Sequence, residues 1–217
     1  MQKKEHSLCF TGHRSEKLPK TEEQLETLTL RLWEEIDKAI GNGIDTFYFG
    51  ACYGFDLMCA DIVAKRKRVI KTSDPKSIKL IAVIPFENQA IRWKELDREI
   101  YYDTLAQCDE VITLNTHYKQ SCYHERNRYM VDRCSKMIAY YDGGSGGTAY
   151  TVNYANTNGL EMSHKEGDVY EELIITNYDP RPYLQMKNHQ LNLFSFISLL
   201  NEGEYKLIHK PSSPLKA

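Results

Sequence analysis

Residues 137–150 read MIAYYDGGSGGTAY, an apolar run, then four glycines within five positions, then a helix-like segment. The run Met137–Tyr141 has the near-continuous apolar character of a strand that is buried on both faces of a sheet. A strand, a tight glycine turn and a helix together make part of a β-α-β unit, in which neighbouring strands run parallel. The fold therefore depends on whether this alternation repeats along the chain.

The alternation of strand and helix does recur outward from this stretch. Strands are predicted at residues 7–11, 45–50, 79–85, 110–114 and 137–141, with a sixth at 173–177. Helices are predicted at residues 21–41, 56–64, 89–105, 123–133 and 149–156, the first of them capped by Thr21. This pattern predicts an α/β protein with a doubly wound, mainly parallel sheet and helices on both of its faces, a three-layer α/β/α arrangement.

The length suits one domain with an appendage. The chain has 217 residues, and the alternation ends at the sequence DPRP, residues 179–182. We expect a domain over residues 1–180 and a C-terminal extension over residues 181–217. Within the extension, the apolar run LNLFSFISLL predicts a short helix, and the last residues predict a flexible tail. The segment 160–172 is longer than a simple turn, and its role stays open.

Charge and cysteine content narrow the class of protein. The formal net charge is −2, whereas dedicated nucleic-acid binders carry a basic excess, so nucleic acid is not an expected partner. No stretch approaches the roughly 18 apolar residues of a membrane span, and the N-terminus lacks a secretory pattern, so no membrane partner is expected. The six cysteines are scattered without a CxxC pair, which predicts reduced cysteines in a cytoplasmic protein and no metal site.

The candidate site follows from the sheet. In a doubly wound sheet, ligands bind beyond the carboxyl ends of the strands, so the residues after each strand are the ones to examine. Small residues, amides, hydroxyls and arginines gather there. The candidate ligand-binding residues are Thr11, Gly12, His13, Arg14, Gly50, Ala51, Gly54, Asp56, Pro85, Arg126, Asn127, Arg128, Asp142, Gly143, Gly144, Gly146, Gly147 and Thr148.

Two of these loops, Gly50–Asp56 and Asp142–Thr148, place glycines directly before a helix. Glycine lets the backbone approach a ligand closely, and the free N–H groups and dipole at a helix start favour an anion. The two loops therefore predict a ligand that carries phosphate, with no resident cofactor required. The alternative is that these glycines only form tight strand-to-helix turns.

Individual side chains suggest particular roles. The planar guanidinium of Arg14 suits phosphate, and His13 could contact the ligand or act as a general base. Arg126 and Arg128 cannot face one way on a helix, so one is expected at the ligand and the other in a salt bridge. Asp56 either caps its helix or reaches a ribose hydroxyl.

Five segments in order carry a family resemblance: CFTGHR (9–14), GACYGFD (50–56), VIPF (83–86) with the following Arg92-Trp93, CYHERNRYMVD (122–132) and YDGGSGGTAYTVNYA (141–155). Together they resemble the YpsA-like family of the SLOG superfamily, Rossmann-like domains related to the LOG nucleotide-processing enzymes and to DprA. The resemblance implies a Rossmann-like domain whose strand-end loops bind a nucleotide or a nucleotide-derived ligand. Related domains often pair, which makes a homodimer a hypothesis.

One departure from the LOG enzymes bears on activity. Those enzymes cleave a base from a ribose phosphate and carry the motif PGGxGTxxE. Here Thr148 matches the threonine of the motif, but Thr151 stands where the catalytic glutamate would be. The resemblance therefore implies binding more firmly than catalysis, and no catalytic residue is assigned.

Three functions follow from these observations. The favoured one is a sensor or regulatory module that binds a nucleotide-derived ligand without turning it over. The second is a nucleotide-processing hydrolase acting on an N-glycosidic or phosphate bond, with proton transfer by His13, Asp56, Glu125 or Asp142. The third and least favoured is a DprA-like binder of single-stranded DNA, which would need a basic groove.

Overall fold

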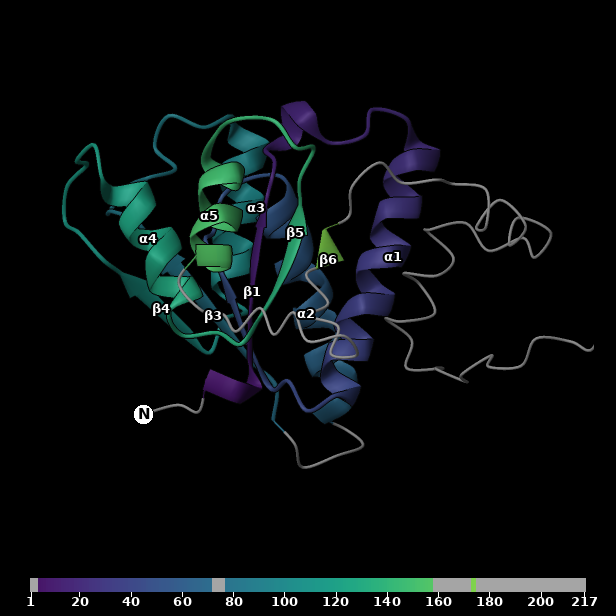
Figure 1. Cartoon of the computed structure of the whole chain (residues 1–217). Helices are drawn as coiled ribbons and strands as arrows, with labels where there is room; N and C mark the ends of the chain where they lie inside the picture. Colours follow the sequence, from purple (N-terminus) through teal and green to yellow (C-terminus); the bar gives the residue numbers. More distant parts are fainter. Residues whose placement is uncertain (1–3, 72–76, 158–172, 175–217) are drawn as a thin grey trace, which may run out of the picture. The chain divides into compact units, whose positions relative to one another are not determined.

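The structure is a computed structural model that describes residues 4–71, 77–157 and 173–174. Within these residues, six strands form one sheet and α-helices pack on it (Figure 1). The strands are β1 (Ser7–Gly12), β2 (Thr46–Phe49), β3 (Lys79–Ile84), β4 (Glu110–Thr113), β5 (Lys136–Tyr140) and β6 (Leu173–Ile174). The helices are α1 (Glu22–Gly41), α2 (Phe55–Lys71), α3 (Glu95–Leu105), α4 (Cys122–Val131) and α5 (Gly147–Thr157), with 3-10 turns at Lys4–His6 and Ser15–Lys17.

The sheet confirms the predicted fold class. Its strand order is β4-β3-β2-β1-β5-β6, and all of these pairings are parallel. Cys9 in β1, for example, lies between Tyr48 of β2 and Met137 of β5. The chain runs outward from β1 to β4 and then returns to the other side of β1. The point where the strand order reverses therefore lies between β1 and β5, where ligands bind in such sheets.

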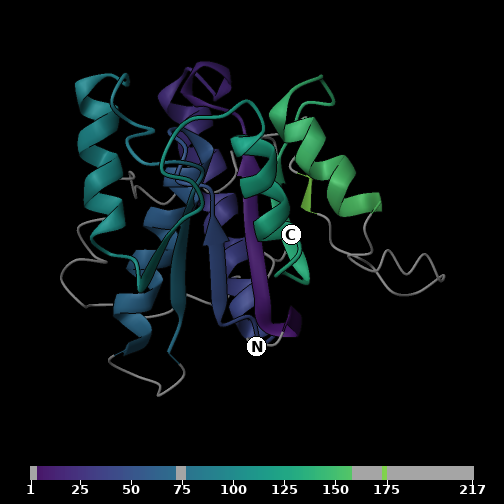
Figure 2. The same cartoon turned by 90° about the vertical axis from the view of Figure 1, so that its left-hand side faces the viewer.

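Helices cover both faces of the sheet (Figure 2). Helix α2 contacts β1, β2 and β3 and packs against α1, whereas α4 and α5 pack against each other on the other face. Successive strand residues point to opposite faces. Cys9 and Tyr48 accordingly join the core under α4 and α5, and Phe10 and Phe47 stack on the opposite side with ring centroids 6.0 Å apart.

Two helix ends show how side chains fix the boundaries. The hydroxyl of Thr21 accepts a hydrogen bond from the backbone N–H of Gln24 at 3.3 Å, which confirms the predicted cap of α1. Helix α2 continues to Lys71, well beyond its predicted end. Two basic residues of this extension pair with carboxylates outside the helix, Arg66 with Asp37 of α1 and Lys67 with Asp109.

The helix predicted over residues 89–105 begins later than expected, at Glu95. The residues before it form turns in which Asn88 has a φ of 57°, in the left-handed region. The side chain of Gln89 turns inward and donates a hydrogen bond to the carbonyl of Ala51 at 3.0 Å. Gln89 is therefore held by a buried hydrogen bond to another loop, in a turn that precedes the helix.

Some predictions fall outside the described residues. The segment 160–172, the C-terminal extension 181–217 and the domain boundary at residue 180 remain predictions. Residues 173–174 pair with β5, as a sixth strand requires. Among the helices of the described ranges, none has the length and apolar character that crossing a membrane needs.

Candidate functional site

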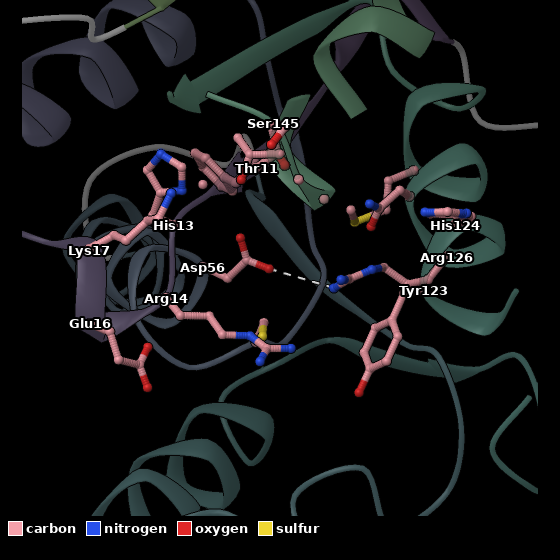
Figure 3. Close-up of a pocket in the computed structure, with 18 residues that line it drawn as sticks. Thr11, His13, Arg14, Glu16, Lys17, Asp56, Tyr123, His124, Arg126 and Ser145 are labelled. Atoms are coloured by element: carbon pink, nitrogen blue, oxygen red, sulfur yellow. Dashed lines mark ion pairs between the residues drawn. The ribbon is translucent and has the colours of Figure 1, made fainter. Parts of the chain in front are cut away.

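A cavity of about 510 Å³ opens at the carboxyl ends of β1 and β5, the point where the strand order reverses (Figure 3). Its walls come from the loop after β1, the start of α2, the inner face of α4 and the loop that opens α5. Ten of the predicted residues line it: Thr11, Gly12, His13, Arg14, Asp56, Arg126, Asn127, Gly146, Gly147 and Thr148. The topology thus brings together loops that lie far apart in the sequence.

The glycine loop before α5 presents bare backbone to open space. Gly146 has a φ of 139°, and its carbonyl accepts the N–H of Tyr150 at 3.0 Å, as the first hydrogen bond of the helix does. The N–H groups of Gly147 and Thr148 consequently have no partner within the helix. A β-carbon added to Gly147 would meet no atom within 4 Å. An anion could therefore approach this backbone without displacing protein atoms.

In the other glycine loop, Gly50–Asp56, the glycines leave space for neighbouring parts of the protein. A β-carbon on Gly50 would overlap the guanidinium of Arg126, and one on Gly54 would collide with the backbone of Arg14 and Ser15. Gly54 also has a φ of 94°, where other residues are strained. Neither glycine is among the residues that line the cavity. Their part is to let the β1 loop and Arg126 pack closely against the start of α2.

Arg126 and Asp56 form a buried ion pair across the cavity wall. The Nη1 of Arg126 donates to the carbonyl of Gly50 and lies 3.6 Å from Oδ2 of Asp56, and both side chains are about nine-tenths buried. Burial raises the pKa of Asp56 to about 6, against the opposing effects of the Arg126 charge and of backbone N–H groups at Cys52 and Gly50. The Nε of Arg126 has no hydrogen-bond partner among the described residues.

His13 and Asp142 meet beside the glycine loop. The Nε2 of His13 lies 3.1 Å from Oδ1 of Asp142, close enough for an ionic contact but not aligned as a hydrogen bond. The same oxygen accepts the backbone N–H of Gly144 at 2.9 Å, and Lys17 lies 3.5 Å from the other oxygen. The Gly144 N–H, followed by the charges of His13 and Lys17, lowers the pKa of Asp142. Asp142 thus ties the loop to the cationic side of the cavity, although it does not itself line it.

The two arginines of α4 face different ways, as the helix geometry predicts. Arg126 lines the cavity, whereas the Nε of Arg128 donates to the hydroxyl of Tyr150 at 2.5 Å. Arg128 also lies over the rings of Tyr150 and Tyr154, 5.7 Å from each centroid. The prediction of a salt bridge for the second arginine is corrected, because its hydrogen bond goes to a tyrosine hydroxyl on α5.

Thr151, which replaces the glutamate of the LOG motif, joins α4 to α5. It is fully buried, and its hydroxyl donates to the carbonyl of Gly147 at 2.8 Å. The same oxygen accepts a hydrogen bond from Nδ2 of Asn127 at 2.6 Å. The side chain therefore holds Asn127 and the glycine loop in place and offers no carboxylate to a ligand.

The remaining predicted residues also lie off the cavity. Ala51 has a φ of 50°, and its carbonyl accepts the amide of Gln89. The carbonyl of Pro85 accepts Nδ2 of Asn115 at 2.8 Å. Gly143, with a φ of 79°, turns the chain after β5. These residues shape the loops around the site.

Eight lining residues escaped prediction: Phe10, Glu16, Lys17, Cys52, Tyr123, His124, Met130 and Ser145. A signal existed for two of them. Tyr123 stands three residues before Arg126 and Met130 stands four residues after it, so helical periodicity places both on the face of α4 that carries Arg126. Within residues 4–71 and 77–157, no three histidine, cysteine or acidic side chains gather so as to hold a metal ion.

Together, the fold and the site define a Rossmann-like α/β domain with an open cavity where its strand order reverses. The chain belongs to the YspA SLOG family (YpsA), whose family model matches residues 8–178. The resemblance seen in the five sequence segments is thereby confirmed.

Relatives of the chain include two proteins from bacilli. A UPF0398 protein of Bacillus pumilus (strain SAFR-032) is 23% identical over 140 residues, 62% of this chain and 73% of the relative. A UPF0398 protein of Bacillus cereus (strain G9842) is 26% identical over 146 residues, 65% and 77% of the two chains.

Two solved structures are similar at low identity. The X-ray structure of TM1055 has 12% identity and a TM-score of 0.43, covering 69% of this chain and 67% of that one. DNA processing protein A from Helicobacter pylori, whose structure is described for its single-stranded DNA binding mode, has 15% identity and a TM-score of 0.46, covering 90% and 79%. At these sequence identities and TM-scores, neither similarity indicates the function of this chain.

Proposed function

We propose that this protein binds a nucleotide or a nucleotide-derived, phosphate-bearing ligand in the cavity at the carboxyl ends of its strands. The observation that carries the proposal is the bare backbone of Gly146 and Gly147 at the start of α5, which faces open space within that cavity. The N–H groups that a helix leaves unpaired at its start, together with the helix dipole, favour an anion. The volume of about 510 Å³ lies in the usual range for small-molecule sites.

The charges around the cavity support an anionic ligand. Arg14, Lys17 and Arg126 line it, against the carboxyl groups of Glu16 and Asp56. The raised pKa of Asp56 lessens its negative charge near neutral pH relative to an ordinary carboxylate. The unpartnered Nε of Arg126 leaves one donor of a buried guanidinium for a further acceptor.

A sensor or regulatory role agrees best with the groups present. At the position of the LOG glutamate, Thr151 is buried and hydrogen-bonded within the protein. It cannot stabilise a developing positive charge on a ribose or activate water. Binding without turnover is therefore the primary proposal.

One observation favours a hydrolase as the second candidate. Asp56 lines the cavity, and burial raises its pKa to about 6, close to the value that suits a general acid or base near neutral pH. Such a shift also occurs in purely structural ion pairs. Product analysis on a bound nucleotide separates the two candidates.

The proposal is tested by a thermal-shift screen of mononucleotides, dinucleotides, cyclic nucleotides and ADP-ribose. A ligand at 100 times its Kd should stabilise the protein by about 2.7 kcal/mol. We expect at least one compound to do so for the wild type and to lose the effect in Gly147→Asp, which adds a negative charge to the bare backbone. Incubation of that compound with wild type and Asp56→Asn, followed by chromatography, would reveal hydrolysis. No shift with any compound would contradict the proposal.

A further inference from the structure

Three rings form a nearly parallel column across α4 and α5. His124 stacks on Tyr150 with centroids 4.0 Å apart and planes 19° apart. Tyr150 in turn faces Tyr154 across 6.3 Å at 12°. The two tyrosines are one helical turn apart on α5, so they share a face of the helix. The hydrogen bond between Asn127 and Thr151 holds the two helices that carry the column together.

Polar contacts fix the orientation of the column. Arg128 donates to the hydroxyl of Tyr150 at 2.5 Å, and its guanidinium lies over the rings of Tyr150 and Tyr154. The hydroxyl of Tyr154 donates to Oδ1 of Asp132 at 3.0 Å. Rings held in this way lose little freedom when a further ring is added, which lowers the cost of binding.

The column ends at the cavity. His124 is its terminal ring and lines the same cavity as the bare backbone of Gly147. In Figure 3, His124 lies on the side of Tyr123 and Arg126, across the pocket from His13. Tyr150 takes one face of the His124 imidazole. A planar group in the cavity could therefore stack on the other face and extend the column.

The second aromatic cluster at the cavity is less suited to stacking. Tyr123 meets Phe86 at an interplanar angle of 84° and Tyr118 at 59°. Phe86 and Tyr118 also meet edge to face, at 77°. Rings that meet at such angles contact one another edge to face or at a tilt and do not form a parallel stack that a further ring could extend.

We propose that the base of the bound nucleotide stacks on His124 while its phosphate lies at Gly146 and Gly147. This inference rests on the proposed function and adds a recognition residue to it. Every nucleobase has a face that can stack, so this contact distinguishes a nucleotide from a sugar phosphate and does not choose among bases. The ligand class is accordingly a nucleotide with an intact base.

Titration calorimetry on the full chain tests the assignment with AMP, GMP, CMP, UMP and ribose 5-phosphate as probes. In the wild type we expect the best nucleotide to bind about tenfold or more tightly than ribose 5-phosphate. His124→Ala should bring the nucleotides to the affinity of ribose 5-phosphate and leave ribose 5-phosphate unchanged. His124→Phe should keep the preference, because it keeps a ring. His117→Ala, at an exposed loop position, is the matched control and should behave as wild type.

The outcomes separate this inference from the proposed function. Equal affinities of nucleotides and ribose 5-phosphate for the wild type would overturn the stacking assignment and leave the phosphate site standing. Equal losses of affinity for nucleotides and for ribose 5-phosphate in His124→Ala would also overturn the stacking assignment and leave the phosphate site standing. Failure of all five probes to bind the wild type would overturn the stacking assignment, whereas the proposed function is decided by the wider screen that includes dinucleotides, cyclic nucleotides and ADP-ribose.

Discussion

Gly50 shows how a single missing side chain positions the site. Its α-carbon leaves the space that the guanidinium of Arg126 occupies. We expect Gly50→Ala to lower the free energy of unfolding by about 2 kcal/mol or more, because the new methyl group must displace a buried ion-paired arginine. Urea denaturation monitored by circular dichroism measures the change.

A matched control for this substitution lies at the end of α1. A β-carbon on Gly41 would meet nothing within 4 Å. Gly41→Ala should therefore leave stability unchanged or raise it by up to about 1 kcal/mol. Equal effects of the two substitutions would contradict the role given to Gly50.

Asp56 should make stability depend on pH in a defined direction. Its pKa is about 6 in the folded protein against an ordinary value of 3.8. Well below pH 3.8 the carboxyl group is protonated in both the folded and the unfolded state. Between the two values the folded state keeps a proton that the unfolded state has lost, so the unfolding free energy falls as pH rises. The full loss, on the order of 3 kcal/mol, is present above the folded pKa.

Asp56→Asn removes this titration and serves as the reference. We expect the wild type to lose stability relative to Asp56→Asn as pH rises from about 4 to 6, because only the wild type titrates there. The measurement is urea denaturation of both proteins across that range. A difference that stays constant with pH would show that the Asp56 carboxyl group has an ordinary pKa.

At the residue scale, the sequence could identify the two glycine loops but not the structural role of each glycine. Gly50 and Gly147 each lie between an apolar strand and a helix, so each suggests that a ligand or another part of the protein approaches the backbone closely. The structure shows that Arg126 makes that approach at Gly50, whereas open cavity faces Gly147. Such a partner is set by tertiary packing and leaves no trace in the local sequence.

At the element scale, the contact between α4 and α5 depends on a buried hydroxyl. Thr151→Val would leave the amide of Asn127 without its 2.6 Å acceptor. We expect a loss of about 1–3 kcal/mol in the free energy of unfolding, because a buried polar group loses its hydrogen bond. Chemical denaturation measures it.

Thr157 provides the same chemical change on the same helix. Its hydroxyl donates to the carbonyl of Asn153 at 2.9 Å at an exposed position. Thr157→Val should change stability by less than about 0.5 kcal/mol. A Thr151→Val protein as stable as Thr157→Val would contradict the structural part assigned to Thr151.

Periodicity locates the elements well and their ends less well. The cap at Thr21 is visible in the sequence because a short side chain and its N–H partner lie three residues apart. The start of α3 is not visible in the sequence, because Gln89 donates a hydrogen bond to a backbone carbonyl 38 residues earlier in the chain. Local patterns cannot register such a contact.

At the scale of the whole molecule, alternation predicts a parallel sheet but not its strand order. The return of β5 to the side of β1 is a long-range pairing, of Cys9 with Met137 for example. That pairing decides which loops meet, so it also decides which candidates line the cavity. The sequence could predict at which edge of the sheet a ligand binds, but not which residues line the cavity there.

The net charge of −2 bears on one alternative function. We expect a labelled single-stranded DNA oligonucleotide not to bind at about 0.15 M salt, because such binding draws most of its affinity from a basic surface. Fluorescence anisotropy measures this directly. Binding that weakens steeply as salt is added would instead favour the DprA-like alternative.

The bare backbone at the start of α5 is the proposed binding site for the phosphate of the ligand. The most direct measurement is the nucleotide affinity of Gly147→Ala by titration calorimetry, beside Gly41→Ala, since the added methyl group meets no protein atom in either variant. We expect folding stability to be unchanged or up to about 1 kcal/mol higher in both variants, and nucleotide binding to be weaker only in Gly147→Ala. Wild-type affinity in Gly147→Ala would contradict the proposed phosphate site and would leave the glycines as turn residues alone.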